Sequence, residues 1–192
     1  MQLPDSRAMI PGSSGAKARD TEPSSLVVVD ASFVLKLVLP EEHSDRVRRA
    51  WGKWVEQGVE VFAPYLLVYE VTSVLRHKVF RGELAPEEGE AALLAIQAQG
   101  IRLLHPEGLE QVTWRLAQEI ERPTAYDTSY LALAELLGCE LWTADMRLKN
   151  AAQGRLPYLR WIEELPSPGP KEGRGGTRGQ RSAVRGRRLA EG

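Results

Sequence analysis

Short apolar runs alternate with amphipathic segments along residues 26–166. The first run, Leu26-Val27-Val28-Val29, is continuous and mostly β-branched, which is typical of a strand buried on both faces of a parallel sheet. The same patterns predict further strands at 59–63, 101–104, 139–143 and 158–162, and helices at 31–39, 44–57, 65–80, 85–99, 109–120, 124–137 and 147–152. Strands that alternate with helices through short links predict an α/β fold with a parallel sheet.

Prolines and glycines mark several of the predicted helix ends. Pro40 lacks the amide hydrogen that would continue the first helix, and Gly58 and Gly138 suit the positions that follow a helix. Ser44 or Asp45 is predicted to cap the second helix. These residues give most of the expected element boundaries.

The two ends of the chain have a different composition. Residues 1–25 mix Pro, Gly, Ser and Ala with three acids and three bases and show no periodicity, and residues 167–192 are rich in Gly and Arg. Such segments bury too little apolar surface to offset their ordering entropy, so we expect a disordered leader and a disordered basic tail. The intervening residues 26–166 are predicted to form one domain.

The net charge of the chain is unevenly distributed among these three segments. The formal charge of the 192 residues is −1, but residues 26–166 hold 15 bases and 21 acids, a balance of −6. The tail holds seven bases and two acids, a balance of +5. The near neutrality is a cancellation, and it does not exclude a nucleic-acid partner. The tail is a candidate RNA tether, although a passive tail has the same composition.

Cysteine usage and hydropathy indicate the compartment. A single cysteine excludes an intramolecular disulfide framework and any multi-cysteine zinc site, which favours a reducing compartment. No apolar run approaches a membrane span, and the N-terminus lacks the apolar stretch of a signal peptide. We expect a cytoplasmic protein without a membrane partner.

Two aspartates follow predicted strands. Asp30 comes directly after the first strand, and Asp145 follows the strand at 139–143 in the run Trp142-Thr143-Ala144-Asp145. The carboxyl ends of strands in an open parallel sheet form the crevice where ligands bind, so these side chains are placed to converge. Each aspartate also suits the N-cap of the helix that follows it, and the sequence leaves both interpretations open.

Two further carboxylates lie on predicted helices near apolar faces. Glu70 falls at the margin of the apolar stripe of its helix, where a carboxylate is costly to desolvate unless a cation or a donor meets it. Its stem also has the length to reach solvent. Asp127 shares a largely apolar face with Tyr130, whereas Thr124-x-x-Asp127 also matches a loose capping box.

Four carboxylates in one crevice repel each other, so a site that holds them ionised needs divalent cations. Oxygen-only ligation suits Mg²⁺ or Mn²⁺. Such ions activate water and stabilise in-line displacement at a phosphodiester. The residues therefore indicate a metal-dependent phosphoryl-transfer site.

The order of three segments also resembles a known family: VVVDASFVLKLVLPEE, then APYLLVYEVTSVLRHKV, then TAYDTSYLALAELLGCELWTADMRL. They resemble the PIN-domain ribonucleases, and most of all the VapC-like toxins of type II toxin–antitoxin modules. The resemblance spans about 140 residues and is strongest over 126–148, where D-x-S-Y-L-A-L-A precedes L-x-T-A-D. It implies a three-layer PIN-like fold with a central parallel sheet of about five strands flanked by helices.

The resemblance also implies roles for particular residues. Asp30, Glu70 and Asp127 match the principal acids of the family, Asp145 matches its fourth, and Thr143 matches its hydroxyl residue. The expected metal ligands are Asp30, Asp127 and Asp145, and Glu70 is expected to bind the metal directly or through water. Thr143 and Ser32 are expected to orient the ligands. Ser32 equally suits a structural role at a helix start. The implied activity is Mg²⁺- or Mn²⁺-dependent endoribonuclease action. The implied partners are RNA, a second copy in a homodimer and a small cognate antitoxin.

Other polar and aromatic residues have simpler interpretations. Candidate phosphate contacts are weak, because charged helix faces are usually only solvated; they are Arg76, Lys78, Arg147 and Lys149. His77 is expected at the surface, Cys139 as a small buried residue, and Trp51 and Trp54 in packing or a dimer face before base stacking. The alternatives are a PIN nuclease of RNA processing without an antitoxin, and a PIN-like binding module that cleaves nothing. A phosphoryl-acceptor fold is disfavoured because Asp30-Ala31-Ser32 lacks a second acid.

Overall fold

The computed structural model describes residues 26–152 and 154–166, and the predicted leader and basic tail lie outside them. A single parallel sheet of five strands runs through the described residues, as predicted. The strands are β1 (Leu26–Val29), β2 (Glu60–Pro64), β3 (Arg102–Leu104), β4 (Glu140–Thr143) and β5 (Leu159–Trp161).

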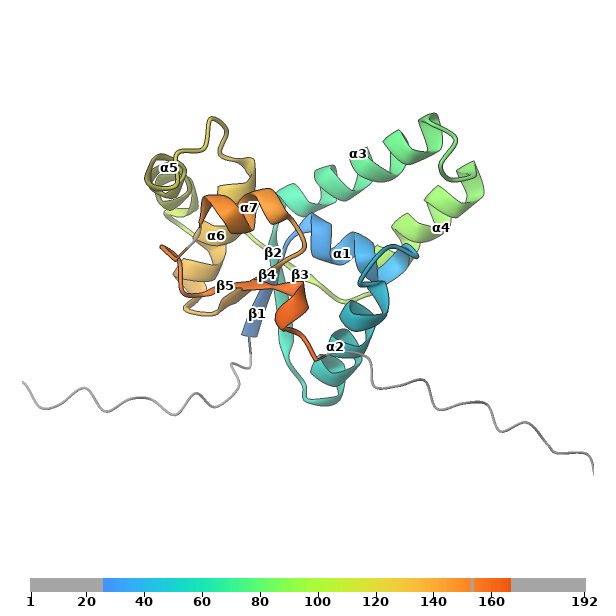
Figure 1. Ribbon diagram of the computed structural model, residues 1–192, viewed down its shortest axis with the longest axis horizontal. Helices are drawn as coiled ribbons and strands as arrows, with labels where there is room; N and C mark the ends of the chain where they lie inside the picture. Colours follow the sequence, from blue (N-terminus) through green and yellow to red (C-terminus); the bar gives the residue numbers. More distant parts are fainter. Residues whose placement is uncertain (1–25, 153, 167–192) are drawn as a thin grey trace, which may run out of the picture.

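Seven α-helices of the described residues flank this sheet (Figure 1). They are α1 (Ala31–Val38), α2 (Ser44–Glu56), α3 (Leu66–Phe80), α4 (Pro86–Gln97), α5 (Leu109–Glu119), α6 (Tyr126–Leu137) and α7 (Met146–Ala151), and a 3₁₀ turn, η1 (Ile162–Glu164), follows β5. Among the described residues, no helix combines the length and the apolar character that crossing a membrane requires.

The strand order is β3-β2-β1-β4-β5, so β1 lies at the centre of the sheet. Val28 and Val29 are completely buried there, which explains why β1 is a continuous apolar run. The chain reverses its direction of travel across the sheet after β3, and α6 returns it to β4 on the other side of β1. The carboxyl ends of β1 and β4 are therefore neighbours, which is the usual place for a ligand crevice.

The helices fall into two groups. α3 and α4 lie side by side and extend away from the sheet (Figure 1), and both also contact α1. α5 packs on α6, which in turn contacts β1, β2 and β4. Because α3 and α6 each reach the carboxyl end of the sheet from a different group, their side chains can meet over β1.

Most helix boundaries agree with the predictions, and α6 shows one instructive difference. α1 ends before Pro40 and α6 ends at Gly138, whose φ of +64° is left-handed. α6 begins at Tyr126, two residues later than predicted, and its N-cap, Ala125, has no side-chain bond to the helix. The capping box that Thr124 suggested does not form, because the carboxylate of Asp127 is engaged elsewhere.

The tryptophans of α2 are packing residues. Trp54 stacks on Phe33 with ring centroids 5.5 Å apart, and it also meets Trp51 and Trp142 at 6.2 and 5.9 Å. Cys139 is buried in the same core, as expected for a small apolar residue. This aromatic cluster attaches α2 to α1 through Phe33 and to β4 of the sheet through Trp142.

Candidate active site

One cavity of about 310 Å³ lies at the carboxyl end of the sheet, and four carboxylates line it. They come from four different elements: Asp30 follows β1, Glu70 lies on α3, Asp127 lies in the first turn of α6, and Asp145 follows β4. The full lining is Asp30, Ala31, Ser32, Leu35, Glu70, Ser73, Val74, Asp127, Tyr130, Asp145 and Leu148. The structure therefore brings together all four carboxylates that the sequence singled out.

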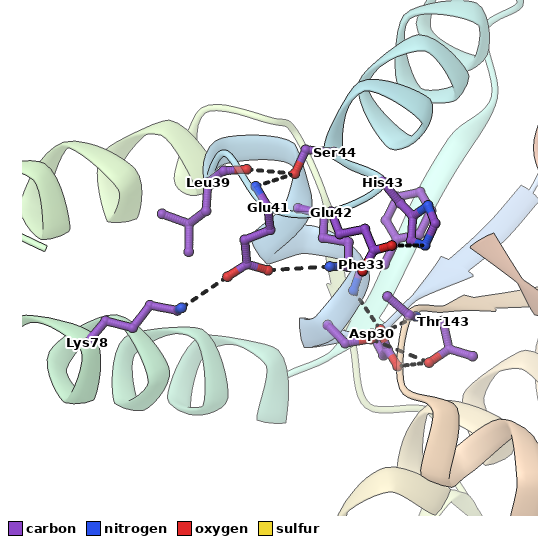
Figure 2. A network of polar contacts seen from close by, with 12 residues as sticks. Asp30, Phe33, Leu39, Glu41, Glu42, His43, Ser44, Lys78 and Thr143 are labelled. Atoms are coloured by element: carbon purple, nitrogen blue, oxygen red, sulfur yellow. Dashed lines mark hydrogen bonds and ion pairs between the residues drawn. The ribbon is translucent and has the colours of Figure 1, made fainter. Parts of the chain in front are cut away.

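Asp30 is the most deeply placed of the four, with only 5% of its surface exposed. Its Oδ1 accepts hydrogen bonds from the hydroxyl of Ser32 (2.7 Å) and from the amide of Phe33 (2.9 Å), and its Oδ2 accepts one from the hydroxyl of Thr143 (2.5 Å; Figure 2). Burial raises the pKa of Asp30 to about 6, even though these hydrogen bonds lower it, and the charge of Asp145 raises it further. Burial destabilises the ionised form of Asp30, and a nearby cation would stabilise it.

Thr143 connects the two strand ends. Its side chain is completely buried, and its Oγ1 accepts a hydrogen bond from the amide of Asp145 (2.9 Å) while it donates to Asp30. Ser32 likewise accepts a hydrogen bond from the amide of Ala144 (2.8 Å). The two hydroxyl residues therefore join the end of β4 to the Asp30 carboxylate, and their role in orienting metal ligands stays a prediction.

The capping interpretation and the crevice interpretation hold together for the two strand-end aspartates. Asp30 is the N-cap of α1, and Asp145 is the N-cap of α7, where its Oδ1 accepts from the amide of Arg147 (2.7 Å). Capping employs part of each carboxylate and leaves each side chain on the wall of the cavity. The alternatives that the sequence left open are thus not exclusive.

Glu70 turns inward rather than extending to solvent. It is half-buried, and its Oε2 accepts a hydrogen bond from the phenol of Tyr130 (2.5 Å). Burial raises the pKa of Glu70, the Tyr130 hydrogen bond opposes this, and the charge of Asp127 adds to the rise. Tyr130 is itself 1% exposed, and burial beside Glu70 raises the pKa of its phenol, which therefore stays protonated and donates.

Asp127 forms an ion pair instead of a capping box. The Nη2 of Arg122 donates to its Oδ2 at 2.6 Å, and both side chains are partly buried. Arg122 lies in the loop between α5 and α6, five residues before its partner. An arginine of the chain itself is therefore bound to one of the four cavity carboxylates.

The side chains of the cavity suit a hard divalent cation, because their charged donors are all carboxylate oxygens. Two of these carboxyl groups, Asp30 and Glu70, have raised pKa values. As the side chains stand, residues 26–152 and 154–166 contain no three His, Cys, Asp or Glu side chains grouped closely enough to hold one ion. Glu70 is bonded to Tyr130 and Asp127 to Arg122 in this arrangement. Binding of one ion by several of these carboxylates requires their side chains to come closer together than they stand here.

The four predicted phosphate contacts do not line the cavity. Lys78 pairs with Glu41 at 3.0 Å (Figure 2) and with Glu83 at 3.6 Å, and these two carboxylates largely neutralise its positive charge. The guanidinium of Arg76 lies 5.8 Å from the ring centroid of Phe80, and the ammonium of Lys149 lies 4.9 Å from that of Trp161. Arg147 is exposed. Their contact with RNA stays a prediction, as do the individual catalytic roles of the acids.

Sequence reasoning missed two residues of this site. Tyr130 was treated only as a neighbour on the apolar face of its helix, although a tyrosine at a buried position needs a partner for its hydroxyl. Arg122 carried no recognisable signal, because nothing in its loop shows that it turns toward Asp127. Both contacts join residues on different elements or across a loop, so only the folded chain reveals them.

The chain belongs to the PIN-domain family, and the sequence model of that family matches residues 27–154. Its relatives include VapC ribonuclease Mb0985 of Mycobacterium bovis, which is 31% identical over 132 residues, covering 69% of this chain and 95% of that protein. The resemblance stated from the sequence is thereby confirmed.

Two solved structures support the fold. PAE2754 from Pyrobaculum aerophilum superposes with a TM-score of 0.55 at 22% identity, over 72% of this chain and 90% of that one. VapC20 of Mycobacterium tuberculosis, a sarcin-ricin loop cleaving toxin, superposes with a TM-score of 0.50 at 19% identity, over 65% of this chain and 94% of that one. At these identities the likeness establishes the PIN fold.

Proposed function

We propose that this protein is a Mg²⁺- or Mn²⁺-dependent endoribonuclease, the toxin of a VapC-type toxin–antitoxin pair. The observation that carries the proposal is the convergence of Asp30, Glu70, Asp127 and Asp145 on one cavity from four separate elements. The similarity to a VapC ribonuclease over nearly the whole length of that protein supports it. Cleavage of cellular RNA places the protein in the cytoplasm, and residues 26–166 form the nuclease domain.

The residues divide the work as follows. Asp30, Asp127 and Asp145 hold the ion, and Glu70 binds it directly or through water. A bound divalent ion supplies an activated water and neutralises the charge that develops on the phosphoryl group. Thr143 and Ser32 fix the orientation of the Asp30 carboxylate by donating to both of its oxygens. The wall of the cavity thus supplies binding and orientation without a protein nucleophile.

The direct test compares RNA cleavage by the wild type, Asp30→Asn and Asp127→Asn in Mg²⁺ and in Mn²⁺. Asp45→Asn is a matched control, since Asp45 is exposed in the first turn of α2 and does not line the cavity. We expect a loss of about 10²-fold or more in both site variants, and full activity in the control. Equal cleavage by all four proteins would refute the site.

The same experiment separates the alternatives. A PIN-like binding module predicts no cleavage with any metal. If the protein is instead a nuclease that processes RNA, it should cleave RNA without arresting growth when it is produced in cells. The toxin predicts arrest that requires Asp30 and Asp127, together with a neighbouring small gene whose product relieves the arrest on co-expression. That product is the proposed antitoxin, and a DNA-binding fold with an acidic amphipathic tail is the sequence pattern to look for.

A groove beside the cavity supports the proposed homodimer. It has a volume of about 470 Å³ and is mainly apolar, and four aromatic side chains on its wall are more than half exposed. These residues, the aromatic patch, are Tyr65, Tyr69, Trp114 and Tyr126. Tyr69 and Tyr126 directly precede Glu70 and Asp127 in the chain, so the same two helices carry residues of the patch and of the cavity. Exposed apolar surface of this kind marks interaction sites.

Charge within the groove favours a second protein copy over RNA as its occupant. The acidic and basic side chains that line it are Glu110 and His105, and Oε1 of Glu110 lies 2.7 Å from Nε2 of His105. Trp114→Asp is expected to convert a dimer to a monomer in sedimentation analysis. Leu94→Asp is the control, since Leu94 is exposed on α4 to a similar extent (59% against 67% for Trp114) but lies outside the groove. A monomeric wild type would refute the homodimer.

A further inference from the structure

The backbone that carries Arg122 is held in an uncommon conformation. α5 ends in a Schellman motif, in which the amide of Arg122 donates to the carbonyl of Ala117 (2.8 Å) and the amide of Glu121 donates to that of Gln118 (3.2 Å). Glu121 occupies the left-handed position of this motif with a φ of +56°, where glycine is usual. A non-glycine residue in this region costs energy, and such strain is concentrated at functional sites.

The guanidinium of Arg122 has spare donor capacity. Of its five N–H donors, the Nη2 bonds to Asp127 at 2.6 Å. Its Nε is buried and has no hydrogen-bond partner among the residues that the structure describes. A buried, unpaired donor on a cation is energetically costly, so the guanidinium would gain from a further acceptor. Arg122 does not itself line the cavity, and it is linked to the cavity through Asp127.

The cavity lacks a positive group for an RNA phosphate. Its lining holds four carboxylates and, within residues 26–152 and 154–166, no lysine or arginine. Lys78 is paired with two glutamates, and Arg76 and Lys149 lie over aromatic rings. Arg122 is the cation that a cavity carboxylate holds in place.

We propose that Arg122 has two successive partners in the nuclease site. It neutralises Asp127 while the site is metal-free, and it binds a phosphate of the RNA once a divalent cation has taken Asp127. A planar guanidinium suits this exchange, because the same fork that pairs with a carboxylate pairs with a phosphate. The inference rests on the proposed endoribonuclease function and adds a substrate-binding residue to it.

The test measures metal affinity and cleavage on the full chain of four proteins: wild type, Arg122→Gln, Arg122→Lys and Arg115→Gln. Arg115 is a matched control, because it lies on α5 and pairs with Glu119 and Glu135, outside the cavity. Calorimetric titration with Mn²⁺ in the absence of RNA gives the metal affinity. Cleavage of a labelled single-stranded RNA at saturating Mn²⁺ gives kcat and KM.

The two readouts are expected to move in opposite directions. Arg122→Gln removes the competitor for Asp127, so Mn²⁺ binds about three- to tenfold more tightly, as expected for a partly exposed ion pair. The same change lowers kcat/KM for RNA by about 10²-fold, because a charged donor is lost. Arg122→Lys keeps the charge and recovers part of the rate. Arg115→Gln leaves both quantities unchanged.

A merely structural ion pair gives a different result. Mn²⁺ affinity in Arg122→Gln that is equal to or weaker than in the wild type overturns the proposal, and so does unchanged cleavage. If Arg122→Gln does not fold, Arg122→Met, which keeps the apolar stem, is put through the same two measurements. A wild type that binds Mn²⁺ but cleaves no RNA refutes the proposed function instead, and the Mn²⁺ comparison still decides the competition at Asp127.

Discussion

Replacing Asp30 by asparagine should stabilise the metal-free protein at neutral pH while it abolishes activity. Asp30 is buried, and its pKa in the folded chain is about 6 against an ordinary value of 3.8. An asparagine keeps two of the three hydrogen bonds and reverses the third: its Oδ1 can accept from Ser32 and Phe33, and its Nδ2 can donate to the hydroxyl oxygen of Thr143. The Thr143 proton then turns toward Oγ of Ser32, which lies 3.4 Å away. The substitution therefore removes a buried charge, and the Thr143 hydroxyl exchanges a carboxylate acceptor for the weaker contact with Ser32.

The size and the pH window of this effect follow from the raised pKa. The folded chain holds the Asp30 proton more tightly than the unfolded chain, so the contribution of Asp30 to stability falls as the pH rises from about 4 to about 6. A shift of about two pKa units corresponds to about 3 kcal/mol. Asp30→Asn should thus match the wild type near pH 4 and exceed its free energy of unfolding by about 3 kcal/mol above pH 6.5.

Urea denaturation in EDTA at several pH values between 4 and 8 measures this difference. Asp45→Asn is again the control, and because its side chain is exposed we expect it to change stability by less than about 1 kcal/mol throughout. A wild type that is the more stable protein at pH 7, or a difference that stays constant with pH, would refute the account of Asp30. Adding Mn²⁺ should then stabilise the wild type and leave Asp30→Asn almost unchanged.

Three other substitutions test the packing around the site by thermal or urea unfolding. Tyr130→Phe leaves an oxygen of half-buried Glu70 without its donor and should lower the free energy of unfolding by about 1–2 kcal/mol at pH 7. Because the substitution raises the pKa of Glu70 further, the loss of stability should be smaller at pH 4. A loss that does not change with pH would contradict this role of the hydrogen bond. Gly89→Ala places a Cβ 2.5 Å from Cγ2 of Val79 between α4 and α3 and should cost about 1–3 kcal/mol, so a more stable variant would show that the helices separate freely. Glu121→Gly should stabilise the chain by about 1 kcal/mol by relieving its left-handed backbone, and a loss of stability would mean that the position is not strained.

Local patterns predicted the elements of this fold because each pattern reports its own environment. The apolar run of β1 reflects burial on both faces, and Pro40 and Gly138 end their helices through backbone properties that need no tertiary context. The start of α6 was placed too early because Thr124 and Asp127 satisfy a local capping pattern. That pattern lost to the ion pair between Asp127 and Arg122, a contact across a loop.

The four acids of the candidate site were also visible in the sequence, for a physical reason. Asp30 and Asp145 follow strands, and the ends of parallel strands meet at one edge of a sheet. Glu70 and Asp127 are charged residues beside apolar helix faces, where an isolated carboxylate is costly. Position and cost together indicated a shared cation site before any distance was known.

What each carboxylate touches was decided by the tertiary structure alone. The hydrogen bond of Tyr130 to Glu70 joins residues 60 apart, and that of Thr143 to Asp30 joins residues 113 apart. No local pattern records such pairs, since they arise where α6 and α3 meet at the cavity and where β4 lies beside β1. The sequence by itself determined the elements and the acids, because both depend on burial and backbone chemistry near each residue. The partners of those acids, Arg122 among them, depend on which elements become neighbours when the chain folds.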